Sequence, residues 1–138
     1  MPQRSKFDRP IAYHRAFVGV VGSVNAAVML SQAVYWSTRT TGVDGWFWKT
    51  RDQWEEETGL SRYEQEGARK LLSQQSFWKE ELRSAPAKMH FYVDQDKLDD
   101  AVDEWVDRQE WVADIDESIK TVKTKDKTNV PVGGKLAD

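Results

Sequence analysis

Two helix-start signals on either side of a glycine constrain this chain more than any other feature of its sequence. Gln53 follows Thr50 by three residues, and Glu64 follows Ser61 by the same spacing. In each pair the hydroxyl can cap a helix while the longer side chain bonds back to the cap residue, an arrangement called a capping box. Gly59 lies between them and tolerates the left-handed conformation that ends a helix. The sequence therefore predicts two helices joined by a sharp turn.

The segments around this helix pair predict the remaining elements. Residues 11–22 mix aromatic and β-branched side chains, which favours an extended segment or strand. Residues 24–37 have apolar side chains at helical spacing and predict a central buried helix. Residues 46–48 predict a short strand, and residues 77–93 predict a β-hairpin. This order of helix, strand, helix-turn-helix and hairpin wing predicts an α+β winged helix-turn-helix fold.

The net charge of −3 over 138 residues hides an uneven distribution. Residues 1–10 are polar, and we expect a flexible N-terminus ahead of a winged-helix domain over residues 11–93. Residues 1–93 together have a net charge of +3, whereas residues 94–119 have a net charge of −9 and predict an acidic amphipathic helix. Residues 120–138 have the composition of a flexible tail. Nucleic acid is therefore not excluded as a partner of the domain.

The composition argues against several classes of protein. With no cysteine, the chain has no disulfide, thiolate metal site or cysteine nucleophile. No apolar run reaches the roughly 18 residues of a membrane span, and residues 1–10 lack the apolar stretch of a signal peptide. We therefore expect a cytoplasmic protein without a membrane partner.

No catalytic constellation is visible in the sequence. His14 has no serine, aspartate or metal-ligand pattern at a recognisable spacing. The carboxylates of residues 55–57 occupy successive helical positions, about 100° apart, and do not converge. Residues 19–22 lack the glycine spacing of a phosphate-binding loop. We expect no enzymatic activity, no cofactor and no metal.

The helix that begins at Ser61 is the expected DNA-contacting element. Ser61 and Arg62 lie at its N-terminus, where amide groups and a guanidinium can meet phosphate. Gln65 and Arg69 are one turn apart and could pair with adenine and guanine, each contact contributing about 1 to 3 kcal/mol of discrimination. The predicted DNA-binding residues are Arg51, Ser61, Arg62, Tyr63, Gln65, Arg69, Lys70, Lys79, Arg83 and Lys88.

Acidic side chains on the same two helices support an alternative. Residues 55–57, Glu64 and Glu66 are all glutamates, and acids near a phosphate backbone weaken binding. A DNA-binding protein of this composition is expected to have modest affinity and a shallow salt dependence. The alternative is a protein-interaction module that keeps the winged-helix fold and binds, or inhibits, a host or phage protein.

Spread-out sequence similarity suggests a family. The segments IAYHRAF, GSVNAAVMLSQAVYW, GWFWKTRDQWEEETGLSRYEQEGARKLL and PAKMHFYVDQDKL, within residues 11–98, resemble winged-helix proteins of bacteriophages, prophages and mobile elements. Many of these are described as replication or hypothetical proteins. The resemblance implies a double-stranded DNA-binding role in replication initiation or transcriptional control, in the cytoplasm of a bacterial host. Initiators usually have a further helicase-loading domain, so we expect an accessory or regulatory protein.

Five tryptophans have two interpretations, core packing or stacking on unpaired bases. Core packing is the expected role for most of the five. They are Trp36, Trp46, Trp48, Trp54 and Trp78. Strand alternation, however, places Trp46 and Trp48 on one side and Phe47 on the other. One face of that strand is therefore a candidate partner surface.

The acidic helix has an apolar stripe formed by Leu98, Val102, Trp105 and Val112. The stripe needs a partner, which is the domain's own body, a second copy of the chain in a homodimer, or another protein. Trp111 lies outside the stripe and favours an intermolecular contact.

Overall fold

The helix pair forms as the two capping boxes predict. The computed structural model describes residues 10–40 and 44–129, in which α3 spans Arg51–Thr58 and α4 spans Arg62–Leu72. The Thr50 and Ser61 hydroxyls accept the backbone N–H groups three residues on, at 3.1 Å in both cases. Both capping boxes are complete, and Gly59 ends α3 in the left-handed conformation with φ of 78°. The second helix ends at Leu72, slightly earlier than expected.

The first segment is helical, so the prediction of a strand over residues 11–22 is wrong. Helix α1 spans Arg15–Val21, and α2 spans Val24–Arg39. Phe17 and Val21 lie one turn apart on α1, and both are buried in the core. The same apolar residues that suit a strand can thus form one face of a helix. Among the described residues, no strand pairs with this segment. The predicted buried helix over residues 24–37 is confirmed.

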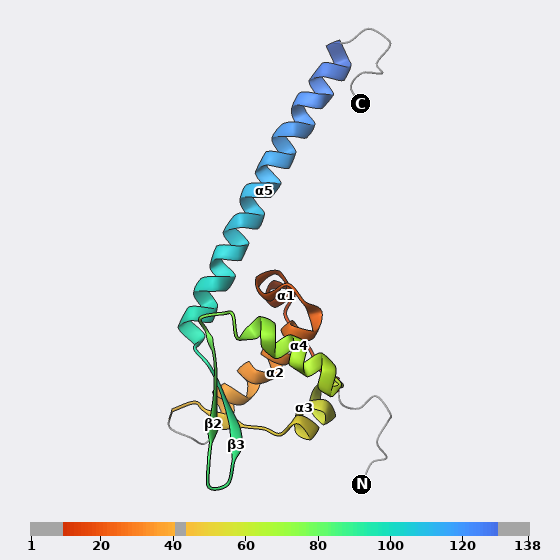
Figure 1. The fold of residues 1–138 in the computed structure, drawn as a ribbon. Coiled ribbons are helices and arrows are strands. Elements are labelled where there is room, and N and C mark those ends of the chain that lie inside the picture. The colour runs from red at the N-terminus through yellow and green to blue at the C-terminus, as the bar shows by residue number, and fades with distance from the viewer. Residues whose placement is uncertain (1–9, 41–43, 130–138) are drawn as a thin grey trace, which may run out of the picture. The chain divides into compact units, whose positions relative to one another are not determined.

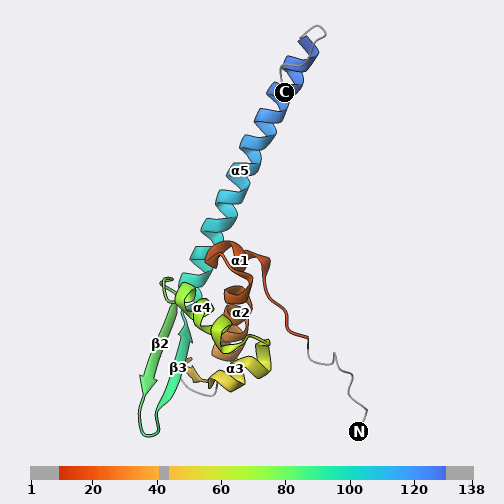
Figure 2. The ribbon, with the colours of Figure 1, turned by 45° about the vertical axis from the view of Figure 1, so that its right-hand side comes forward.

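Three strands form an antiparallel sheet in the order β1-β3-β2. Their bounds are Phe47–Trp48 for β1, Trp78–Arg83 for β2 and Lys88–Val93 for β3, so the predicted strand and hairpin are confirmed. The two strands of the hairpin are seen as arrows beside the helices in Figure 2. Phe47 pairs with Phe91 in register, and both are buried. We call this the inner side of the sheet, and Trp48 and its partner His90 lie on the other side.

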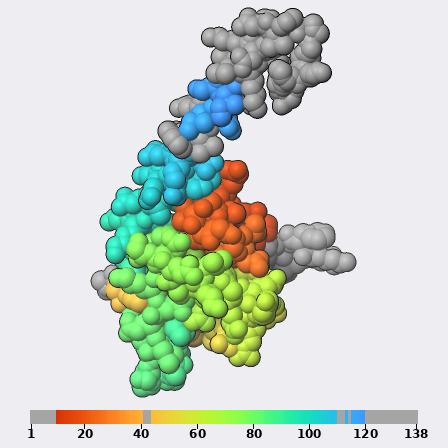
Figure 3. Space-filling view, turned by 45° about the horizontal axis from the view of Figure 1, so that its top comes forward, coloured from red at the N-terminus to blue at the C-terminus, as the bar shows by residue number. Residues whose placement is uncertain are grey.

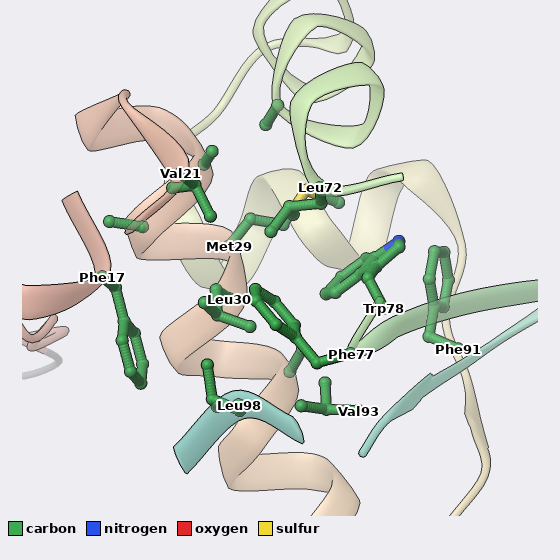
Figure 4. Close-up of a cluster of buried hydrophobic side chains, with 14 of the residues drawn as sticks. Phe17, Val21, Met29, Leu30, Leu72, Phe77, Trp78, Phe91, Val93 and Leu98 are labelled. Atoms are coloured by element: carbon green, nitrogen blue, oxygen red, sulfur yellow. The ribbon is translucent and has the colours of Figure 1, made fainter. Parts of the chain in front are cut away.

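The core lies between α2, α4 and the inner side of the sheet (Figure 4). Leu30 and Met29 of α2, Leu72 of α4 and Phe77 before β2 have no exposed surface. Trp54 is 1% exposed and fills the space where α3 meets Phe91, with its ring 5.3 Å from the phenylalanine ring. Core packing is thus confirmed for Trp54, and also for Trp78. Trp36 is partly buried and packs against this core. Trp46, which stacks on Tyr92, and Trp48, at 43% exposure, lie on the other side of the sheet, so core packing is wrong for these two.

The last helix, α5, spans Gln95–Asn129, and the chain divides into two units within it, residues 1–102 and 103–138. Asp94 caps α5, because its carboxylate accepts the backbone N–H of Lys97 at 3.1 Å. The helix continues ten residues past its expected end at 119, so residues 120–129 are helical and not an irregular tail. The segments predicted to be flexible at the two ends otherwise lie outside the described residues.

The described chain is therefore α+β, with five helices and three strands in an order compatible with a winged-helix layout (Figure 1). Among the described helices, no single one is both long and apolar enough to cross a membrane. Helices α1 and α2 would reach that length only together, and they are bent by 117° where they meet.

Candidate nucleic-acid interface

Helix α4 presents an exposed face whose outermost residues are Tyr63, Glu66, Gly67 and Lys70, flanked by Arg62. We call these five residues the α4 face. Tyr63 is 85% exposed, the largest value among the exposed large hydrophobic side chains. Within the described part of the chain, the side chains of Arg62, Tyr63 and Lys70 make no hydrogen bond or ion pair. Their predicted outward position is confirmed.

Gln65 does not belong to this face, and the prediction that it points outward is wrong. Its side chain is 2% exposed, and Nε2 donates to two backbone carbonyls, Arg51 O and Leu60 O, at 3.0 Å each. These carbonyls lie on α3 and in the turn between the helices. Gln65 therefore joins the two helices and is not available to contact a base.

Arg69 is also an internal residue. Its guanidinium donates to the Glu80 carboxylate from Nε at 3.1 Å and 3.2 Å and from Nη2 at 2.5 Å, and it lies 5.5 Å from the Phe91 ring centroid. The Arg69 side chain is 21% exposed and the Glu80 side chain 18%. The pair holds α4 against β2, so the predicted base contact by Arg69 is wrong and its role is positional.

The acids that seemed to oppose DNA binding are partly used inside the fold. Glu64 accepts the backbone N–H of Ser61 at 2.8 Å and so serves the helix cap. Glu66 lies 4.0 Å from Arg51, in an exposed pair that contributes little to stability. Glu57 points inward. Glu64, Glu66 and the carboxylates of residues 55–56 are nevertheless exposed, and of these five acids only Glu57 is partly buried.

Glu57 is the centre of a polar network between α3, α2 and the end of β1. Its carboxylate accepts hydrogen bonds from Gln32 Nε2 at 2.8 Å, Trp36 Nε1 at 2.7 Å and Lys49 Nζ at 2.5 Å. Partial burial by itself raises the pKa of the Glu57 carboxyl, but the bonds from Lys49, Trp36 and Gln32 outweigh it, and the pKa lies below its ordinary value. The network ties α3 to α2 and to the residue after β1. Nothing in the local pattern of the sequence signals it.

The three predicted wing cations lie apart from the α4 face. Lys79, Arg83 and Lys88 alternate with the inner residues of their strands, so they lie on the outer side of the sheet. Glu80, which pairs with Arg69 of α4, is on the inner side. The hairpin and α4 are neighbours (Figure 3), but the cations are directed to the other side of the sheet. The residues predicted to form one DNA-binding surface therefore lie on two separate surfaces.

A shallow groove of about 450 Å³ runs along one side of the α4 face. Tyr63, Gly67 and Lys70 line it from α4, and Ser23 and Asn25 line it from the start of α2. A methyl group added at Gly67 would meet no atom within 4 Å, so packing within the chain does not require a glycine there. The groove therefore lets a ligand approach the backbone of α4 closely.

The apolar stripe of α5 is divided between the two units. Leu98 is 3% exposed and belongs to the core, and Val102 packs against it. For these two residues the domain's own body is the partner, one of the three alternatives left open by the sequence, and the prediction that they form a dimer or partner contact is wrong. Trp105 is half-buried in the second unit, and the side chain of Val112 lies outside the described residues.

No family model, curated protein or solved structure matches the chain. Among the described residues, no group of three or more histidine, aspartate or glutamate side chains is placed to hold a metal ion.

Proposed function

We propose that the chain is a winged helix-turn-helix protein that binds double-stranded DNA through the α4 face. The main support is that Arg62, Tyr63 and Lys70 are exposed on one face of a capped helix without partners in the described chain. An α-helix fits the major groove, and unpaired cations on it can meet phosphates. Arg51, exposed at the start of α3, lies close enough to extend this set.

The sequence resemblance supports the biological setting of this proposal. A phage or mobile-element protein of this kind would act as an accessory factor in replication or as a transcription regulator. With Gln65 and Arg69 committed to the fold, the α4 face has few groups for direct base contacts. Phosphate contacts and the close approach of DNA at Gly67 then contribute most of the binding free energy, so only a weak preference for particular DNA sequences is expected.

Fluorescence anisotropy with a labelled random duplex, at low and moderate salt, tests this proposal. We expect Arg62→Ala combined with Lys70→Ala to weaken binding roughly tenfold or more and to reduce the salt slope by about two, one for each lost phosphate contact. Lys97→Ala combined with Arg108→Ala is the matched control, since it removes the same charge from exposed positions on α5. Equal binding by both double variants would refute the assigned surface.

The exposed side chains of Tyr63 and Leu82, at 85% and 66%, favour a second candidate function, a protein-interaction module of the same fold. Aromatic side chains such as Tyr63 are typical of the centre of a protein interface. This candidate predicts no duplex binding even at low salt. The anisotropy titration therefore separates the two functions directly.

A further inference from the structure

The outer side of the sheet has a composition that the proposed duplex contact does not use. Aromatic residues and cations lie there together, with Glu81 as the one acid that the described strands place on this side. We call this set the outer sheet face, formed by Trp46, Trp48, Lys79, Arg83, Lys88 and His90. Its strands come from two parts of the chain, since β1 precedes the helix pair and the hairpin follows it. The face is therefore assembled only in the folded domain.

The aromatic rings of the outer sheet face are arranged as an open platform. Trp48 is 43% exposed, which is unusual for so large a ring. Trp46 is stacked on Tyr92, with ring centroids 5.3 Å apart and an angle of 25° between the ring planes. The buried aromatics Phe47 and Phe91 lie on the inner side, so the core has no need of the outer rings. The outer rings thus present flat apolar surface to a ligand.

Cations lie directly over these rings. Lys88 Nζ is 3.7 Å from the centroid of the Trp48 ring, and Arg83 Cζ is 5.1 Å from that of Trp46. Arg83 also contacts Glu81 at 3.3 Å and Asp44 at 4.0 Å, so its charge is partly compensated. Lys79 is exposed on the same face. Among the described residues, Lys79, Arg83 and Lys88 exceed these two acids, and the face has a positive balance.

A hollow of about 450 Å³ lies at one edge of this surface. Trp46, Trp48, Arg83 and His90 line it from the sheet, and Arg39 lines it from the end of α2. Ligand sites of small molecules begin at about 300 Å³, so one nucleotide fits a hollow of this size. Asp44 also lines the hollow, so its two guanidiniums exceed the acid by one charge. Aromatic rings beside a guanidinium suit a planar base joined to an anionic phosphate.

We infer that the outer sheet face binds single-stranded nucleic acid by stacking unpaired bases on Trp48 and pairing phosphates with Lys88 and Arg83. A base that stacks on Trp48 takes the place of the Lys88 ammonium, whose flexible side chain can then reach the adjoining phosphate. A duplex cannot bind in this way because its bases are stacked on one another. The inference is independent of the duplex contact through the α4 face.

The test is anisotropy of a labelled oligothymidylate of about 12 nucleotides with the full chain at low salt. We expect Trp48→Ala to weaken binding roughly tenfold, since stacking on one ring contributes that much, and Trp48→Phe to retain most of it. Tyr13→Ala is the matched control, because Tyr13 is an exposed aromatic at 46% on α1's side of the domain. No binding by the unmodified chain, or equal loss in the Tyr13 and Trp48 variants, would overturn the inference.

Two further measurements keep this test separate from the duplex proposal and from folding defects. The double variant Arg62→Ala, Lys70→Ala should bind oligothymidylate as tightly as the unmodified chain. If this double variant loses oligothymidylate binding while Trp48→Ala keeps it, the inference is overturned. Photocrosslinking of the unmodified chain to an oligonucleotide containing 5-iododeoxyuridine should label the tryptic peptide of residues 40–49, which includes Trp48. Labelling confined to other peptides would contradict the assignment.

Discussion

Replacing Glu57 with glutamine should destabilise the domain by about 3 kcal/mol, although the two side chains have nearly the same shape. Lys49 is the reason, because its side chain is 5% exposed and its ammonium has Glu57 as its ion-pair partner at 2.5 Å. Removing one partner of a buried pair costs about 3 to 5 kcal/mol, since the other charge remains uncompensated. The lower end applies here because Glu57 keeps 24% exposure and the Trp36 ring, 4.3 Å from Lys49 Nζ, still faces the ammonium.

Urea denaturation followed by tryptophan fluorescence measures this loss. Glu56→Gln is the matched control, since it makes the same chemical change at an exposed neighbouring position and should alter stability by less than about 0.5 kcal/mol. Adding Lys49→Met to Glu57→Gln should recover part of the lost stability, because no buried cation is then left without a partner. A loss below about 1 kcal/mol in Glu57→Gln would refute the argument and identify the pair as effectively solvated.

The Glu57 network also makes the stability of the domain depend on pH. The pKa of Glu57 is lowered in the folded chain from an ordinary value of 4.5, so folding favours its ionised form. The stabilisation is fully present above the unfolded-state pKa of 4.5 and is lost as the pH falls through the lower folded-state value. The difference in stability between the unmodified chain and Glu57→Gln should therefore be constant near neutral pH and should narrow below pH 4.5. A stability difference between the two proteins that stays constant down to about pH 3 would contradict the lowered pKa of Glu57.

Three substitutions on α4 separate its structural from its ligand-binding positions. Gly67→Ala should raise the free energy of unfolding by about 0.5 to 1 kcal/mol in thermal denaturation, because alanine favours the helix and its methyl group meets no atom within 4 Å. The same substitution should weaken duplex binding in the anisotropy titration, because the methyl group keeps the DNA from the backbone of α4. Arg69→Ala should cost about 2 kcal/mol in urea denaturation, because the largely buried Glu80 carboxylate loses its ion-pair partner and keeps the bond from Trp78 Nε1 at 2.8 Å. The folded Arg69→Ala variant should retain its affinity for the duplex. Ser61→Ala should cost about 1 kcal/mol by removing the helix cap, and a neutral result would contradict the capping role.

Local chemistry explains which parts of the fold could be predicted from the sequence. The two capping boxes and Gly59 act within a few residues, so the bounds of α3 and the start of α4 follow from the sequence itself. The hairpin follows from alternation and a turn for the same reason. Helix α1 could not be predicted, because whether its valines form a strand or a helix depends on the partner that the fold supplies.

The candidate site was less predictable, because exposure of a polar side chain is a tertiary property. Gln65 lies at the edge of the apolar face of α4, and it is buried only because Arg51 O and Leu60 O are brought within reach. Arg69 has an acidic partner on β2 that no helical spacing reveals. The exposure of Arg62, Tyr63 and Lys70 could be predicted, since they occupy the side of α4 opposite its buried residues.

Strand β1 has a mechanical consequence despite its two residues. By pairing Phe47 with Phe91 it closes the chain into a loop that contains both helices of the pair and most of the hairpin. The backbone N–H of Lys49 adds a bond to Met89 O at 3.3 Å just beyond the strand. Within this loop the Arg69–Glu80 ion pair joins helix α4 to β2. Opening the β1–β3 pairing would therefore lengthen the free chain on both sides of that ion pair at once, so the two-residue strand and the ion pair support each other.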